Sequence, residues 1–228
     1  MRFTFLLLTL LTCILTHAQE IEIDSVRIPI DEKYLEDQLY IAFTYNMLSN
    51  KPSDINQNGL SGGLALGFIK DLPINKRRNF GFGLGLGYAM NIFVQNLKIT
   101  EENNVVRFEK AMDYSINKLT KQAIEVPFEI RWRTSDPVTY KFWRVYAGMN
   151  FSYVFDFRTK FRDENGTLRT SNIDEVETFQ YGLSLAVGRS TWNLYIYYAL
   201  TNMFKNATYQ QEPIDMYDLN VGLKFYIM

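Results

Sequence analysis

The chain has 228 residues, and its 24 Lys and Arg nearly balance its 25 Asp and Glu. The resulting net charge of −1 gives no basis for nucleic-acid binding, which needs a strongly basic surface. The only cysteine, Cys13, and the only histidine, His17, both lie near the start of the chain.

Residues 1–18 have the pattern of a signal peptide. Arg2 supplies the positive charge, Phe3–Ile14 the apolar core, and Ala18 the small residue after which cleavage is expected. The apolar core is shorter than the roughly 20 residues that a spanning helix needs. A lipoprotein signal would use Cys13, but Thr12 stands where a smaller residue is usual, so we favour simple cleavage.

Cleavage would remove both Cys13 and His17. The mature chain would then lack disulfides, thiol chemistry, the commonest general base and the commonest neutral metal ligand. We therefore expect no enzyme activity, no metal site and no cofactor. Residues 19–37, which hold seven acidic residues against Arg27 and Lys33, predict a short acidic periplasmic lead-in. A solvated tail and a docking segment are both compatible with that composition.

The stretch Asn79–Gln95 carries the most informative pattern in the chain. Its two parities separate large apolar residues from residues with almost no side chain: Phe80, Phe82, Leu84, Leu86, Tyr88, Met90 and Ile92 against Gly81, Gly83, Gly85, Gly87, Ala89 and Asn91. A β-strand sends alternate side chains to opposite faces. An apolar outside over a small interior suits a narrow barrel in lipid.

Seven further segments have strand-like patterns, which gives eight predicted strands: residues 38–48, 59–69, 79–95, 120–134, 141–158, 176–188, 191–201 and 216–228. The sequence does not show which face of the first strand points outward. One face carries Tyr40 and Ala42, and the other carries Ile41, Phe43 and Tyr45. The other strands place their large apolar residues outward. All are longer than the usual soluble strand of about 5–6 residues.

The predicted connections alternate between short turns and long polar loops, of which residues 96–119 and 159–175 are the longest. This pattern predicts an all-β fold: an eight-stranded antiparallel transmembrane β-barrel of the outer membrane, over residues 38–228, with both chain ends periplasmic. A soluble lipocalin-like barrel would instead place its polar faces in water. The glycine face of residues 79–95 is not a typical solvated surface, so we favour the membrane barrel.

Charged residues gather on the inward parity of two neighbouring strands. They are Glu125, Glu129, Arg131, Arg133, Arg144, Asp156 and Arg158. Cross-strand neighbours can pair, and unpaired charges in a confined lumen would be costly, so we expect an ion-pair network. The favoured interpretation is a salt-bridged plug. A gated conducting path and partner contact at the periplasmic rim through Arg131, Arg133 and Arg144 remain alternatives.

Two further features have structural interpretations. An aromatic cluster flanks the short turn at residues 135–140 and predicts a periplasmic aromatic girdle: Trp132, Tyr140, Phe142 and Trp143. Pro127 lies within a predicted strand, where it would mark a bulge or a break in pairing. The glycines of Gly81–Gly85 recur every second residue inside a strand, which excludes a nucleotide-binding loop.

The segment VPFEIRWRTSDPVTYKFWRVYAGMNFSYVF, within residues 124–155, resembles the PorT/SprT family. The family run E-x-P-[FL]-E-[IL]-[RK]-W-R-T is matched by Glu125, Pro127, Phe128, Glu129, Ile130, Arg131, Trp132, Arg133 and Thr134, and Phe142, Trp143 and Arg144 follow it. The signal, the acidic lead-in and the eight strands resemble this family across nearly the whole chain.

The resemblance implies a non-enzymatic outer-membrane protein of Bacteroidota that serves type IX secretion and, in gliding species, gliding motility. The expected partners are membrane lipid and proteins of the secretion machinery, reached through the periplasmic turns and lead-in. An eight-stranded bore is too narrow for folded cargo, so the expected role is accessory or assembly. The alternative is a stand-alone small barrel, either a narrow porin or an adhesin using loops 96–119 and 159–175.

Overall fold

The computed structural model describes residues 37–103, 105–134 and 143–227. The predicted signal peptide and all but the last residue of the acidic lead-in lie outside these ranges. In the described chain, no helix is long and apolar enough to cross a membrane.

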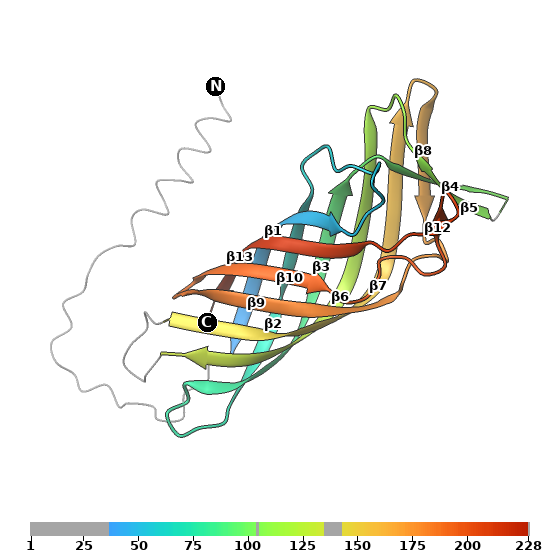
Figure 1. Cartoon of the computed structure of the whole chain (residues 1–228). Helices are drawn as coiled ribbons and strands as arrows, with labels where there is room; N and C mark the ends of the chain where they lie inside the picture. The colour runs from blue at the N-terminus through green and yellow to red at the C-terminus, as the bar shows by residue number, and fades with distance from the viewer. Residues whose placement is uncertain (1–36, 104, 135–142, 228) are drawn as a thin grey trace, which may run out of the picture. The chain divides into compact units, whose positions relative to one another are not determined.

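Eight long strands form a closed antiparallel barrel (Figure 1). They are β1 (Gln38–Ser49), β2 (Gly62–Pro73), β3 (Phe80–Val94), β6 (Ile116–Arg133), β7 (Trp143–Asp163), β9 (Phe179–Arg189), β10 (Trp192–Ala199) and β13 (Tyr217–Ile227). The order around the wall is β6-β3-β2-β1-β13-β10-β9-β7, and pairing of β6 with β7 closes the ring. The all-β, eight-stranded barrel predicted from the sequence is confirmed.

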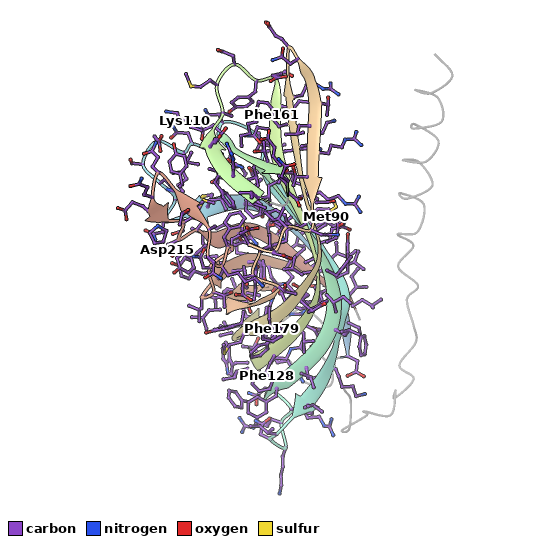
Figure 2. All side chains as sticks on the ribbon, turned by 90° about the vertical axis from the view of Figure 1, so that its right-hand side faces the viewer. Met90, Lys110, Phe128, Phe161, Phe179 and Asp215 are labelled. Carbon is purple, nitrogen blue, oxygen red and sulfur yellow. The ribbon has the colours of Figure 1, made fainter. Side chains whose placement is uncertain are left out.

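The alternation of side chains also follows the sequence prediction along most of the wall. On β3, Leu84 and Leu86 are exposed on the outside, Leu86 by 62%, while Gly81 and Gly83 are buried inside. Phe128 and Phe179, labelled in Figure 2, lie on the same apolar outer surface. An exposed apolar band around a whole barrel is suited to lipid rather than water.

The structure settles the facing of β1, which the sequence left open. Tyr40 and Ala42 are buried in the lumen, and Leu39 and Phe43 are exposed outside. The glycines of β2 and β3 make room for the Tyr40 ring, since a Cβ on Gly87 would overlap the Tyr40 hydroxyl. The bare face of β3 therefore has a packing role, because it receives an aromatic ring from another strand.

The predicted long loops at residues 96–119 and 159–175 contain ordered strands, and so does the connection at residues 202–213. The additional strands are β4 (Leu97–Glu102), β5 (Val105–Lys110), β8 (Gly166–Ser171), β11 (Thr208–Tyr209) and β12 (Glu212–Pro213). β4 and β5 form a hairpin, and β8 pairs with the far end of β7. The labels of β4, β5, β8 and β12 gather at one end of the barrel in Figure 1.

An apolar core, which we call the cap, fills this end of the barrel. Phe204 lies at its centre, with ring centroids 5.3 Å from Phe108 and 5.9 Å from Phe157. The buried members are Leu48, Ile55, Phe93, Leu97, Ile99, Leu119, Ala123, Val154, Phe157, Ile173, Val176, Met203, Phe204, Ala207, Tyr209, Ile214 and Met216. Apolar residues of the loops and of the adjoining wall strands thus build a second core at this end of the barrel.

Candidate functional site

The candidate site is the lumen, where charged side chains from four strands, β2, β6, β7 and β13, are enclosed by the wall. Its end near the short turns is organised by Asp71, which is 0% exposed. Arg131 Nη1 donates to Asp71 Oδ1 at 3.0 Å, while Arg133 Nη1 and Nη2 donate to Oδ1 and Oδ2 at 2.9 and 2.8 Å. Arg131 also donates to Gln38, and Arg133 Nε donates to the Arg78 carbonyl at 2.9 Å.

Glu129 occupies the next level of the lumen. Its Oε1 accepts hydrogen bonds from Lys224 Nζ and the Tyr226 hydroxyl, each at 3.1 Å. Its Oε2 lies 3.5 Å from Arg131 Nε, which joins this level to the Asp71 cluster. Arg144 is buried beside them, with its guanidinium carbon 5.6 Å from the Tyr226 ring centroid. Aromatic faces at this distance stabilise a buried cation.

A third level lies nearer the cap. The Tyr40 hydroxyl donates to Glu125 Oε1 at 2.6 Å. Lys121 forms a buried ion pair with Asp218 and donates to Gln180 Oε1 at 2.6 Å. These contacts join strands far apart in the sequence, so the three levels brace the barrel across its interior.

A cavity of about 40 Å³ remains at this third level, lined in part by Lys121, Glu125, Asn150, Tyr195 and Asp218. One buried water needs about 10–15 Å³, so the cavity has room for only a few waters. The cap core lies on one side of the cavity, and the Asp71 and Glu129 levels lie on the other. The described lumen is therefore a filled interior, as expected for an eight-stranded barrel.

The structure brings together five of the seven predicted charged residues. Glu125, Glu129, Arg131, Arg133 and Arg144 are all buried inside the barrel. The side chains of Arg131, Arg133 and Arg144 are almost completely enclosed, which favours a plug over partner contact at the rim. Pro127 lies in the lumen wall, where β6 stays paired with β7 on both sides of it. On the other edge, the pairing with β3 is interrupted between Leu84↔Phe128 and Gly87↔Glu125, which is the break in pairing that the sequence predicted.

Asp156 and Arg158 do not face the lumen, and their predicted inward placement is wrong. A β-bulge separates the pairs Gln122↔Asp156 and Ala123↔Val154, so β7 carries one extra residue there. An extra residue reverses the facing of everything beyond it. Asp156 accordingly bonds to Gln122 on the outer face at 2.6 Å, and Arg158 is 65% exposed and pairs with Asp156 at 2.8 Å.

The predicted site residues omit four charged members of the network and several polar ones. The charged members are Asp71, Lys121, Asp218 and Lys224, and the polar ones are Gln38, Tyr40, Gln180 and Tyr226. Lys121 and Lys224 could have been found, since both share the inward parity of their strands. The sequence predicts a strand that ends at residue 69, which places Asp71 in the turn that follows. β2 instead continues to Pro73 and carries Asp71 into the lumen.

Two of the four predicted girdle residues are described, while Tyr140 and Phe142 lie outside the described residues. Trp132 and Trp143 are exposed on the outer surface near the short-turn end. Trp192, which was not predicted, lies near Trp143, because both pair with Arg189. Within the described chain, no group of three or more Asp, Glu, His or Cys is placed to hold a metal ion.

Comparison with known proteins gives a family match and a structural likeness. The family described as outer membrane protein beta-barrel domain matches residues 18–205. The crystal structure of Ail, the attachment invasion locus protein of Yersinia pestis, aligns with 83% of this chain and 97% of its own, with 10% sequence identity and a TM-score of 0.37. No curated protein matches the sequence.

Proposed function

The chain belongs to the outer membrane protein beta-barrel domain family and is integral to the outer membrane. From this premise we propose that it is a non-enzymatic accessory or assembly component of a type IX secretion machinery. The observation that carries the accessory role is the filled lumen. Arg131, Arg133 and Glu129 occupy the bore with Asp71, and the cap closes its other end. A filled lumen supports a role in which the barrel contacts partner proteins through its outer surfaces and does not pass cargo through its interior.

The secretion role itself rests on the resemblance of residues 124–155 to the PorT/SprT family. In this proposal both chain ends and the short turns face the periplasm, where partner proteins of the machinery are available. The hairpins and the cap then face the outside. The source would be a member of the Bacteroidota, in which this machinery also supports gliding.

A clean deletion of the gene tests the proposal, with the extracellular and periplasmic proteomes compared and surface adhesins scored in the same cells. We expect cargo proteins to leave the medium and accumulate in the periplasm, with unrelated outer-membrane proteins unchanged. Complementation with the wild-type gene should restore export. Unchanged secretion would overturn the proposal.

A second candidate is a stand-alone surface adhesin, which the ordered hairpins favour. Val105 on the β4–β5 hairpin and Met112 beyond it expose large apolar side chains at the loop end, Met112 by 71%. Shortening the β4–β5 hairpin separates the two candidates. Loss of surface attachment with secretion intact would favour the adhesin, whereas intact attachment would count against it.

The narrow-porin alternative makes a direct electrical prediction. Because side chains fill the bore and only a cavity of about 40 Å³ remains, we expect the purified barrel to give no stepwise conductance in a planar lipid bilayer. A known porin reconstituted in the same way serves as the positive control. Stable conductance steps that change with Glu129→Gln or Arg131→Gln would show instead that ions pass through the lumen.

A further inference from the structure

Beyond the barrel wall, three strands continue as a small sheet at the loop end. The last pair between β7 and β9 is Tyr153↔Phe179. Farther along, β7 pairs with β8 from Arg158↔Ser171 to Asp163↔Gly166, while its other edge stays paired with β6 as far as Ile116↔Arg162. β6, β7 and β8 therefore form one continuous sheet that projects from the wall.

One face of this sheet is fixed against the cap. Leu119 of β6 and Phe157 of β7 belong to the cap core, and Phe161 and Thr170 are also buried. Figure 2 shows the labelled Phe161 at the end of the molecule beyond the wall. Because alternate residues face opposite ways, the neighbours of these buried residues must point to the outer face.

That outer face carries five cations, which we call the cationic ladder: Lys118, Arg158, Lys160, Arg162 and Arg169. Lys118 lies directly opposite Lys160, and Lys160 directly opposite Arg169. Like charges directly opposite each other destabilise a sheet. The pKa of Lys160, which lies beyond the wall, is lowered by Arg162 first, then by desolvation and by Arg169 and Lys118.

Carboxylates of the described chain pair with one of the five cations of this ladder and leave the other four without an ion pair. Arg158 pairs with Asp156 at 2.8 Å, but among the described residues no carboxylate lies within ion-pair distance of Lys118, Lys160, Arg162 or Arg169. Arg162 donates from Nε to the Thr167 hydroxyl at 3.0 Å, which leaves the rest of its guanidinium available. Four aligned cations thus remain open to an external anion.

The ladder is continuous with the apolar outer band of the barrel. On β6 the same parity runs from Trp132 through Ile124 to Lys118, and on β7 Arg158 follows three residues after the exposed Phe155. At about 3.3 Å per residue, Arg158 lies roughly 10 Å along the strand from the last apolar contact. The cations therefore begin where an apolar band of about 25 Å ends, at the height of lipid headgroups.

We propose that the cationic ladder binds the phosphate groups of lipid A in the outer leaflet, holding this glycolipid against the β6–β7–β8 face. The occupant follows from charge and position, since acyl chains would lie on the apolar band while phosphates meet the arginines and lysines directly above it. Arg162 and Arg169 can each offer a guanidinium fork to phosphate oxygens. The proposal assumes that the loop end faces outward and does not depend on a role in secretion.

Lipid retention by the folded full chain in neutral detergent tests this directly, with native mass spectrometry as the readout. The probes are phosphorylated lipid A, its dephosphorylated form and phosphatidylglycerol. We expect the wild type to bind phosphorylated lipid A most tightly, with affinity falling as salt rises. The double variant Lys160→Gln/Arg169→Gln should bind it about 25-fold more weakly, at about 5-fold per basic residue.

The matched control is Lys76→Gln/Arg77→Gln, which removes the same charge from the exposed turn at the opposite end of the barrel. It should retain wild-type affinity, and both variants should keep the heat-modifiable mobility of a folded barrel. Equal loss in both variants would overturn the proposal, as would equal binding of the dephosphorylated lipid or of phosphatidylglycerol.

Discussion

Replacing Asp71 with alanine is expected to lower the free energy of unfolding of the barrel by about 3–5 kcal/mol. Asp71 is fully buried and accepts three hydrogen bonds from Arg131 and Arg133. The substitution would leave two guanidinium ions enclosed without this carboxylate. Breaking a buried pair from one side costs far more than the pair contributes, because the remaining charge cannot regain water. Urea titration of the chain folded in lipid vesicles, followed by tryptophan fluorescence, measures the loss.

The matched control for this substitution is Asp37→Ala. Asp37 pairs with Lys70 at 2.7 Å and accepts a hydrogen bond from the Asp71 backbone N–H at 2.9 Å, but the Asp37 and Lys70 side chains are 30% and 52% exposed. A surface pair of this kind contributes about 0–1 kcal/mol. Equal losses in the two variants would mean that burial of the Asp71 cluster does not govern stability. Asp71→Asn, which keeps the shape and removes the charge, should fall between the two.

Replacing Phe204 with alanine is expected to lower the free energy of unfolding of the cap by about 3–5 kcal/mol, as for other buried phenylalanines. Phe204 is almost fully buried, contacts Phe108 and Phe157 edge-on, and forms a β-bridge with Val176. Its loss would remove the ring that joins the β10–β13 connection to β5 and β7. We expect the loops to become sensitive to protease and their amides to exchange faster, while the wall strands keep their protection.

Met112→Ala is the control for the cap, because Met112 lies at the same end but is largely exposed. This substitution should change the free energy of unfolding of the cap by no more than about 0.5 kcal/mol. Hydrogen exchange resolved by peptide distinguishes the two cores. If Phe204→Ala exposed the wall strands together with the loops, the cap and the lumen network would form one cooperative unit, contrary to the expectation.

The role in secretion and the binding of lipid A can be tested separately, because the ladder variants can be assayed for both cargo export and lipid binding. A ladder variant that exports cargo normally would leave the secretion role intact and confine the ladder to lipid contact. A ladder variant that folds, loses lipid A and also loses cargo export would connect the two surfaces. The ladder variants change only side chains on the outer face of the sheet, so their effects do not depend on a damaged core.

The sequence by itself determined the wall of this protein. Alternation along a strand is a local property of the β backbone, so the bare face of β3 and the apolar outer face of β6 could be read from the order of residues. The same alternation predicted that Glu129, Arg131 and Arg133 lie inside. Eight strands then required a narrow interior, because strand number sets barrel diameter.

Tertiary structure alone decided how the interior is satisfied and what the loop end presents. Asp71 meets Arg131 and Arg133 across about sixty residues of sequence, and nothing local to either segment specifies that partnership. One bulged residue on β7 turned Asp156 and Arg158 outward, because a single insertion reverses every later side chain. The cap likewise depends on tertiary structure, since its apolar members come from segments far apart in the sequence and meet only in the folded barrel.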